Sequence, residues 1–338
     1  MKKSIIIKSV GMYHPEKKVG NEFFIEHFKQ MDEELGGKVE DLLTRTGRKN
    51  RYIADFPNEN IITMGINASK EALESAGIES TELDGIVFAT DNPEYISPTN
   101  AIMVSDALKA TNAHMVYDMN ANCSGMVAAM DQVQSIMKDN KRLNKVLVIG
   151  STTHHHYGLK ISPFTYAMLG DAAFAAILEK EATDQPVGFI DSLYITKTEE
   201  CRSVLHPGCG MSKTLDPNVP IEEKHLIWHG FDPDEPEDRC VEMMEQLVKE
   251  NGYELNQVKH IFFNQLNQSM ISSVADKLAY PLERFKYVGD IYGYTALTSW
   301  CLAYYHSVQD QELQSGDVVV FCSIGAGITA TATLYIVR

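Results

Sequence analysis

The hydrophobic pattern alternates between two periods along the chain. Short, continuous apolar runs predict strands at 83–90, 115–121 and 144–152. The intervening segments space their apolar residues three or four positions apart, as in 61–77, where a closing glycine is typical of a helix C-terminus. Strands that alternate with helices predict a layered α/β fold.

Three segments of the first half recur in the same order in the second half. The pairs are DGIVFATDN (84–92) with KHIFFNQLN (259–267), YDMNANCSGMVAAM (117–130) with YVGDIYGYTALTSW (287–300), and NKVLVIGSTT (144–153) with GDVVVFCSIG (316–325). The offset is nearly constant, from 172 between Asp118 and Asp290 to 175 between Ile86 and Ile261. This regularity predicts a duplicated core, with an N-terminal half over residues 1–180 and a C-terminal half over 181–338.

A cysteine stands at the start of a predicted helix in DMNANCSGMVAAM (118–130). The expected apolar face of that helix carries Met126, Val127, Met130, Val133, Ile136 and Met137, and the polar face carries Asp131, Gln132, Gln134 and Lys138. Free N–H groups and the positive end of the dipole favour an anion at a helix start, and they lower the pKa of a thiol. Cys123 is therefore a candidate nucleophile, and a buried structural cysteine is the alternative.

Composition and charge restrict the possible partners and the compartment. The net charge of −16 disfavours nucleic acids and anionic membrane surfaces, which reward Lys and Arg. No apolar run approaches the roughly 20 residues needed to span a bilayer, and the N-terminus does not follow the signal-peptide pattern. The six cysteines contain no C-x-x-C pair. We therefore expect a cytoplasmic protein with free thiols.

Four segments together point to a known family. They are LLTRTGRKNRYIA (42–54), DMNANCSGMVAAM (118–130), LGDAAFAAIL (169–178) and SIGAGITATATL (323–334). They resemble the corresponding segments of the β-ketoacyl-acyl-carrier-protein synthases III of the thiolase superfamily, over essentially the whole chain. The resemblance implies a thiolase-like duplicated five-layer α/β/α/β/α fold and a homodimer. The implied fold agrees with the internal repeat.

The resemblance also assigns the first chemical step. It makes Cys123 the nucleophile that takes an acyl group from a thioester of coenzyme A or of an acyl-carrier protein, with no permanently bound cofactor and no metal. The oxyanion hole would use the backbone N–H groups of Cys123 and Ala326, and a backbone donor tolerates alanine where φ is negative.

The two usual partners of the family's cysteine are replaced in this chain. Asn264, in NQLN, stands where the family has its histidine, and Tyr294, in GYT, stands where the family has its asparagine. Asn267 keeps the last position of the first motif. Both replacements can donate hydrogen bonds to an oxyanion, but neither is a good base near neutral pH. We expect them to stabilise charge on the second substrate.

The resemblance further indicates how the site is entered and closed. Arg45 keeps a family arginine at the coenzyme A entrance, whereas Asp41, Pro163 and Ser269 replace a tryptophan and two arginines. Fewer cations at the entrance weaken the case for free coenzyme A as donor. Ser97 stands where a residue of the partner subunit closes the acyl pocket in the family, and its small size predicts a roomier pocket.

Several histidines follow predicted strands or lie in loops. The run THHHYG (153–158) is interpreted as a solvated or dimer-contact loop, because consecutive histidines rarely converge on one metal ion. His154, however, falls on an apolar acyl-pocket position of the family, where it would bind a polar acyl group or act as a relocated base. His206 and the acidic segment 230–238 are interpreted as surface turns.

These observations predict an acyltransferase that forms an acyl-thioester on Cys123 and condenses it with a malonyl-type thioester. The product would serve fatty-acid-like, polyketide or other specialised biosynthesis. One alternative is acyl transfer to an alcohol or amine with His154 as base. Another is a non-catalytic partner subunit of an active homologue.

Overall fold

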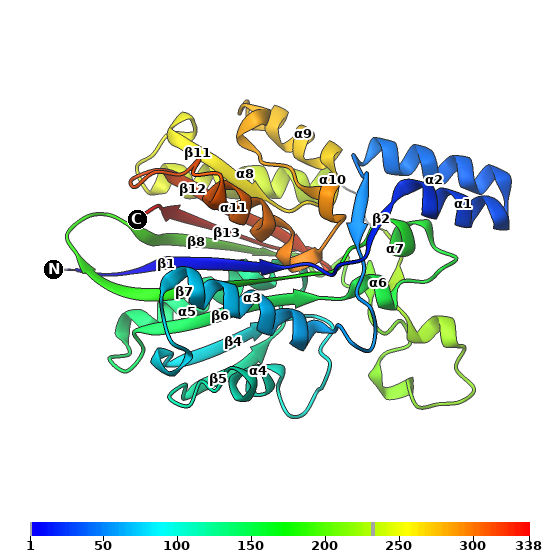
Figure 1. Cartoon of the computed structure of the whole chain (residues 1–338). Helices are drawn as coiled ribbons and strands as arrows, with labels where there is room; N and C mark the ends of the chain where they lie inside the picture. Colours follow the sequence, from blue (N-terminus) through cyan, green and yellow to red (C-terminus); the bar gives the residue numbers. More distant parts are fainter. Residues whose placement is uncertain (1, 231–233) are drawn as a thin grey trace.

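Two mixed β-sheets lie at the centre of the molecule, in a computed structural model that describes residues 2–230 and 234–338 (Figure 1). Across the first sheet the strands are β1 (Lys2–Tyr13), β7 (Ala172–Thr183), β6 (Lys145–Thr152), β4 (Gly85–Ala89) and β5 (Met115–Met119). Across the second sheet they are β8 (Gly188–Thr196), β13 (Thr329–Ile336), β12 (Val318–Gly325) and β11 (Val258–Phe263).

The two sheets share one pattern of strand directions. β7 is antiparallel to both β1 and β6, and β6 is parallel to β4. In the second sheet β13 is antiparallel to both β8 and β12, and β12 is parallel to β11. This equivalence confirms the duplicated core. The chain passes from one sheet to the other between Thr183 and Gly188, a few residues beyond the division expected after residue 180.

Helices form three layers around and between the sheets. α3 (Ile61–Ala76) and α4 (Asn100–Leu108) pack on the first sheet, and α8 (Asp234–Glu250), with α9 (Gln268–Lys277) beside it, packs on the second (Figure 1). α5 (Gly125–Asp139) contacts strands of both sheets, and α11 (Ser299–Gln309) contacts β1 as well as β11 and β12. The expected five-layer α/β/α/β/α arrangement is therefore confirmed.

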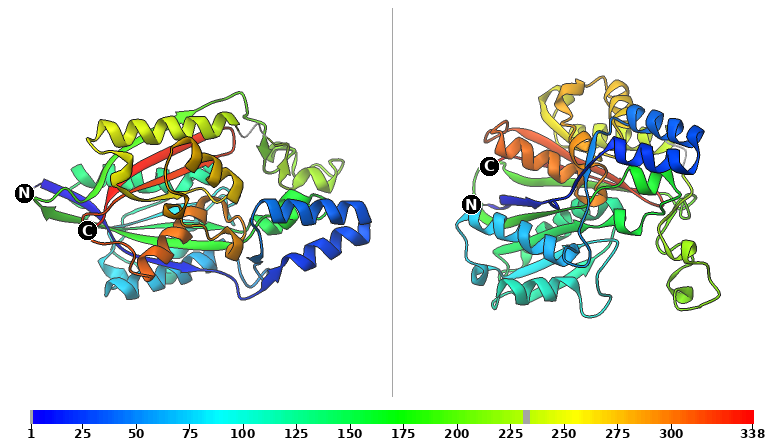
Figure 2. Two further views of the ribbon diagram at one scale, coloured as in Figure 1. Left: turned by 90° about the horizontal axis from the view of Figure 1, so that it is seen from above. Right: turned by 45° about the vertical axis from the view of Figure 1, so that its right-hand side comes forward.

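The remaining elements extend from one end of these layers. They are α1 (Asn21–Met31), α2 (Glu33–Arg45), α6 (His154–Tyr157), α7 (Pro163–Ala167), α10 (Gly289–Tyr292), and two small sheets that pair β2 (Lys18–Gly20) with β3 (Asn50–Tyr52) and β9 (Val204–Leu205) with β10 (Ile227–Trp228). α1 and α2 project together from this end, and the segment between β9 and β10 forms a separate protrusion (Figure 2).

The local predictions succeed where one hydrophobic period dominates. The strands expected at 83–90, 115–121 and 144–152 correspond to β4, β5 and β6, and the helix expected at 61–77 is α3, whose C-cap Gly77 has φ of +64°. Within the described part of the chain, no helix is both long and apolar enough to cross a membrane. All six cysteines are free thiols, as expected.

The prediction that α5 has one buried apolar face and one exposed polar face is wrong in part. Ile136, expected on the buried face, is 40% exposed, whereas Gln134, expected on the polar face, is only 4% exposed. The amide of Gln134 donates hydrogen bonds to Asp131 Oδ1 and Ser135 Oγ, both at 3.0 Å. A helix between two sheets is covered on two sides, so a single apolar face does not describe its burial.

A buried arginine joins the N-terminal region to two loops of the second half. Arg48, 2% exposed, donates hydrogen bonds to the carbonyl oxygens of Gly289 (2.8 Å), Gln265 (2.7 Å) and Leu266 (2.5 Å). It also donates to the hydroxyl of Tyr287 at 3.2 Å. Burial lowers the pKa of this guanidinium, but four oxygen acceptors replace the water that it loses.

We predict that Arg48→Met lowers the free energy of unfolding by about 3–5 kcal/mol, because the substitution leaves buried carbonyl groups without donors. Arg45→Met is the matched control, since Arg45 is exposed at the end of α2. Urea denaturation of both variants measures the difference. Equal stability of the two variants would show that Arg48 does not hold the loops together.

Candidate active site

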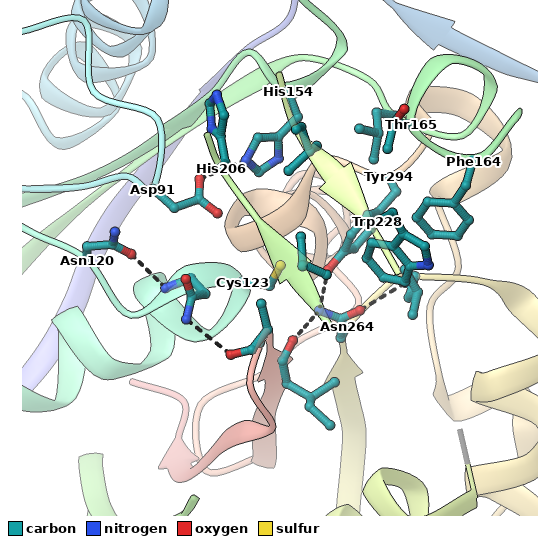
Figure 3. Close-up of a pocket in the computed structure, with 18 residues that line it drawn as sticks. Asp91, Asn120, Cys123, His154, Phe164, Thr165, His206, Trp228, Asn264 and Tyr294 are labelled. Atoms are coloured by element: carbon teal, nitrogen blue, oxygen red, sulfur yellow. Dashed lines mark hydrogen bonds and ion pairs between the residues drawn. The ribbon is translucent and has the colours of Figure 1, made fainter. Parts of the chain in front are cut away.

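A pocket lies where the carboxyl ends of the parallel strands of both sheets meet. Its lining includes five of the residues singled out in the sequence: Cys123, His154, Asn264, Tyr294 and Ala326 (Figure 3). Cys123 and His154 follow strands of the first sheet, whereas Asn264 and Ala326 follow strands of the second. Ligands bind characteristically at this edge of α/β sheets.

Cys123 lies in a short 3-10 turn, Asn122–Ser124, directly before α5. The predicted helix start is thus confirmed, but the predicted lowering of the thiol pKa is wrong. Burial, with a further contribution from the Asp91 carboxylate, raises the pKa of Cys123 to about 12. The Tyr294 hydroxyl and the backbone N–H groups of Cys123 and Ala326 act in the opposite direction, without cancelling the effect of burial. Cys123 is therefore a neutral thiol in the resting site.

Backbone contacts tie the nucleophile turn to the second half of the chain. Ser323 Oγ donates a hydrogen bond to the carbonyl oxygen of Cys123 at 2.7 Å, and Asn122 Nδ2 donates to that of Ala326 at 3.2 Å. Gly325 permits this approach, since an added Cβ would lie 3.1 Å from Asn122 Cβ and 3.2 Å from the Cys123 nitrogen. The turn and the loop that starts at Gly325 therefore hold the two oxyanion donors expected from the sequence side by side.

Asn264 and Tyr294 form one buried hydrogen-bonded unit beside the sulfur. Asn264 Nδ2 lies 3.1 Å from the Tyr294 hydroxyl, 3.2 Å from Ser323 Oγ and 3.2 Å from the Ile324 carbonyl oxygen. Its two amide hydrogens thus face three protein acceptors, so the amide is committed to the framework. Burial and the neighbouring Cys123 raise the pKa of Tyr294 well above its usual value.

The Tyr294 hydroxyl also forms a hydrogen bond with the Cys123 side chain, and this bond favours the thiolate. From the sequence alone, Tyr294 is expected to donate a hydrogen bond only to the second substrate. In the structure Tyr294 is a donor to the nucleophile as well, and Asn264 orients its hydroxyl.

An aspartate that the sequence analysis missed completes the other side of the pocket. Asp91 Oδ1 lies 2.9 Å from His154 Nε2, and the two side chains are 15% and 7% exposed. Burial alone would lower the pKa of His154, but the Asp91 carboxylate raises it; burial alone would raise the pKa of Asp91, but His154 lowers it. Each side chain therefore favours the charged form of the other across a distance of 2.9 Å. Asp91 directly follows the strand predicted at 83–90, and this position at a strand end is the sequence feature that could have identified it as a pocket residue.

His206 lines the same pocket, so its interpretation as part of a surface turn is wrong. Burial, followed by the charge of His154, lowers the pKa of His206 to about 4, so its ring is neutral. The His206 ring lies 4.6 Å from that of Tyr157, which helps to hold it over the pocket. The loop sequence around His206 does not indicate that the residue lies in the pocket, because the pairing of β9 with β10 places this loop over the site.

The three consecutive histidines do not form one loop surface or one metal clip. His154 and His155 are buried, contrary to the solvated-loop interpretation, and only His156 is exposed. His155 stacks on Tyr166 and His156 stacks on Phe56, so the three rings meet different neighbours. Over residues 2–230 and 234–338, no group of three or more His, Cys, Asp or Glu side chains could hold a metal ion.

The acidic segment 230–238 is expected from the sequence to form a surface turn, but part of it is helical. Residues 231–233 lie outside the described part of the chain, and α8 begins at Asp234. Glu237 is buried and accepts hydrogen bonds from Ser273 and Lys277. This part of the segment is therefore helical, and it packs against α9.

Three residues selected from the sequence lie outside the pocket. Arg45 is exposed at the end of α2, Ser97 is exposed in the loop after β4, and Asn267 caps α9 by accepting a hydrogen bond from the Met270 N–H at 2.6 Å. The contact seen for Asn267 is structural. The substrate-binding roles of all three residues stay predictions.

Comparisons with known proteins show which family this chain resembles. Residues 117–198 match the family model for 3-oxoacyl-[acyl-carrier-protein] synthase III, and residues 248–336 match the model for its C-terminal part. The chain is 29% identical over 330 residues to the β-ketoacyl-[acyl-carrier-protein] synthase III of Wolbachia pipientis wMel, covering 97% of this chain and 98% of that protein. It is 28% identical to the corresponding protein of Clostridium perfringens, covering 96% of each.

Solved structures show the same fold over the full length. The 3-oxoacyl-[acyl-carrier-protein] synthase III of Aquifex aeolicus VF5 is similar with a TM-score of 0.81 at 25% identity, covering 99% of both chains. The priming β-ketosynthase of the R1128 polyketide pathway is similar with a TM-score of 0.85 at 22% identity, covering 100% of this chain and 97% of that one.

The raised pKa of Cys123 predicts how its alkylation depends on pH. Iodoacetamide reacts with the thiolate, so the rate should rise roughly tenfold per pH unit from pH 7 to 10, without a plateau near the ordinary thiol value of about 8.5. Tyr294→Phe should slow the reaction by roughly tenfold or more at each pH, because it removes a hydrogen bond to the charged sulfur.

Mass spectrometry of the peptide that contains Cys123 measures this rate separately from that of the other five thiols. A plateau between pH 7 and 9 would contradict the prediction.

Proposed function

Because the chain belongs to the 3-oxoacyl-[acyl-carrier-protein] synthase III family of the thiolase superfamily, we propose that Cys123 carries an acyl group and condenses it with a malonyl-type thioester. One observation carries this proposal: the Cys123 sulfur, the Tyr294 hydroxyl and the N–H groups of Cys123 and Ala326 converge in one pocket. The acyl donor is a thioester of coenzyme A or of an acyl-carrier protein. The pathway is fatty-acid-like, polyketide or other specialised biosynthesis.

In the first half-reaction the Cys123 sulfur attacks the carbonyl carbon of the donor thioester. The N–H groups of Cys123 and Ala326 stabilise the resulting oxyanion. The carrier thiolate then leaves and takes up the proton that Cys123 has lost, so the acyl group and the proton exchange places. A resting neutral thiol is compatible with this exchange, because the departing carrier thiolate acts as the base that accepts the Cys123 proton.

In the second half-reaction decarboxylation of the malonyl group breaks a carbon–carbon bond and leaves an enolate. Tyr294, oriented by Asn264, donates a hydrogen bond to the enolate oxygen. The enolate carbon attacks the acyl carbonyl carbon, and Cys123 leaves as a thiolate that regains the Tyr294 hydrogen bond. The thiolate then takes up a proton from water, which restores the neutral thiol. No step requires Asn264 or Tyr294 to act as a base.

The ion pair of His154 with Asp91 bears on the alternative of acyl transfer to an alcohol or amine. That reaction needs a base that is free of its proton at working pH. Asp91 raises the pKa of His154 in spite of burial, and His154 Nε2 already faces Asp91 Oδ1 at 2.9 Å, so His154 is a poor candidate for that base. The arrangement therefore favours condensation. The assembled nucleophile and oxyanion donors also favour an enzyme over a non-catalytic partner subunit.

We predict that an acyl-coenzyme A or acyl-carrier-protein donor adds one acyl mass to the protein. Intact-protein mass spectrometry should detect this adduct in the wild type and not in Cys123→Ala. If no donor of either type gives an adduct, the partner-subunit interpretation is correct instead.

The same assay separates the two half-reactions. Once acylated, Tyr294→Phe should release product about 10²-fold more slowly than the wild type, because one preorganised oxyanion donor is lost. Tyr253→Phe is the matched control, because Tyr253 is partly buried beneath the second sheet and lies outside the pocket lining. Equal product release by the two variants would remove Tyr294 from the second half-reaction.

We further propose a homodimer formed through the segment that contains Ser97. Four apolar side chains near Ser97 are exposed in the single chain: Tyr95 (47%), Ile96 (74%), Ile102 (48%) and Met103 (39%). Exposed apolar clusters of this kind typically mark interaction surfaces. Light scattering should give twice the chain mass of 37.8 kDa, and Ile96→Asp should shift the protein toward the monomer. A wild type that is monomeric at micromolar concentration would contradict the proposal.

A further inference from the structure

One side of the pocket is polar and is not used by the proposed condensation. Asp91, His154 and His206 gather on one side of Cys123, whereas Asn264 and Tyr294 lie on the other (Figure 3). Asp91 follows β4, His154 begins α6 after β6, and His206 follows β9. These three polar side chains therefore face an acyl group that is attached to the Cys123 sulfur.

The hydrogen-bonding capacity of this cluster is not exhausted by the protein. Asp91 contacts His154 through Oδ1 and gains a further interaction from its own backbone N–H, yet a carboxylate offers about four acceptor sites. His206 is a neutral ring with one donor and one acceptor, and its neighbour Tyr157 approaches ring to ring. An apolar acyl chain seated here would displace water from these groups and supply no partner in its place.

The charges of the cluster limit which polar group would fit. Asp91 Oδ1 and His154 Nε2 lie 2.9 Å apart, and both side chains are largely buried. A carboxylate would be desolvated beside the like charge of Asp91, and an ammonium group would compete with His154 Nε2 for the same Asp91 carboxylate. A hydroxyl avoids both conflicts, because it can donate to the Asp91 carboxylate and accept from a histidine N–H.

We propose that Asp91, His154 and His206 recognise a hydroxyl on the acyl group, so that the chain selects hydroxyacyl thioesters over unsubstituted ones. This inference rests on the proposed acylation of Cys123. Asp91 and His154 accept and donate the hydrogen bonds at the hydroxyl, and His206 closes the site from the loop after β9. No bond to the hydroxyl forms or breaks, and the group determines only which donor is accepted.

The test compares matched four-carbon donors on coenzyme A: butanoyl, 3-hydroxybutanoyl, 4-hydroxybutanoyl, 3-aminobutanoyl and succinyl. The second-order rate constant for adduct formation at Cys123 is measured by intact-protein mass spectrometry. At least one hydroxybutanoyl donor should acylate the wild type roughly tenfold or more faster than butanoyl, and the two charged donors should be slower than both hydroxybutanoyl donors. A hydrogen-bond partner lost from a buried polar site has an effect of this order.

Two variants assign the preference to the cluster. Asp91→Ala with His154→Leu removes both members of the pair together, so neither stays buried without its partner, and the hydroxybutanoyl-to-butanoyl rate ratio should fall to about one. Acylation of this double variant by butanoyl shows that its pocket is still folded. His156→Leu is the control, since His156 is exposed outside the pocket, and the ratio should stay at the wild-type value.

The outcomes separate the two proposals. If the wild type is acylated by butanoyl as fast as by both hydroxybutanoyl donors, or fastest by a charged donor, hydroxyl recognition is wrong and acylation of Cys123 stands. A ratio unchanged in the double variant removes Asp91 and His154 from recognition. If none of the five donors and no carrier-protein donor acylates Cys123 while iodoacetamide still does, the proposed function fails, and this inference fails with it.

Discussion

The active site depends on a buried cation that the protein itself must solvate. Arg48 lies in the N-terminal region, but its guanidinium holds carbonyl groups of the loop that follows β11 and of the first residue of α10. Gln265 and Leu266 directly follow Asn264, so the same contacts fix the residue that orients Tyr294. A guanidinium with five donors suits this task, because one planar group can satisfy several carbonyl oxygens at once.

The duplication of the fold explains why the site lies where it does. Each half presents the carboxyl ends of its parallel strands at the same edge, and the two edges meet around α5 and α11. The first half contributes the nucleophile turn, and the second contributes Asn264, Tyr294 and the loop at Ala326. The bond from Ser323 Oγ to the carbonyl oxygen of Cys123 joins the halves at this turn, so the pocket needs residues of both halves.

Burial shapes the chemistry of this pocket on both sides of the sulfur. On one side it raises the pKa of Cys123, and the Tyr294 hydroxyl with two backbone N–H groups only partly offsets that effect. On the other side the attraction between His154 and Asp91 outweighs the burial of each, so the pKa of His154 is raised and that of Asp91 is lowered. The two sides of the pocket therefore differ: hydrogen-bond donors surround the sulfur on one side, and the contact between Asp91 and His154 lies on the other.

The amino-acid sequence by itself determined the layered fold, the duplication and the position of Cys123 before α5, because hydrophobic period and helix-start signals are local. Its motifs also identified Asn264, Tyr294 and Ala326, which the structure brings into one pocket. Only the tertiary structure decided the rest. The partner of His154 is Asp91 because β4 and β6 are neighbours in the sheet, and sequence spacing does not specify strand order. The pKa of Cys123 is raised, not lowered, because burial depends on every layer packed around the sulfur, whereas the helix start contributes only a local field.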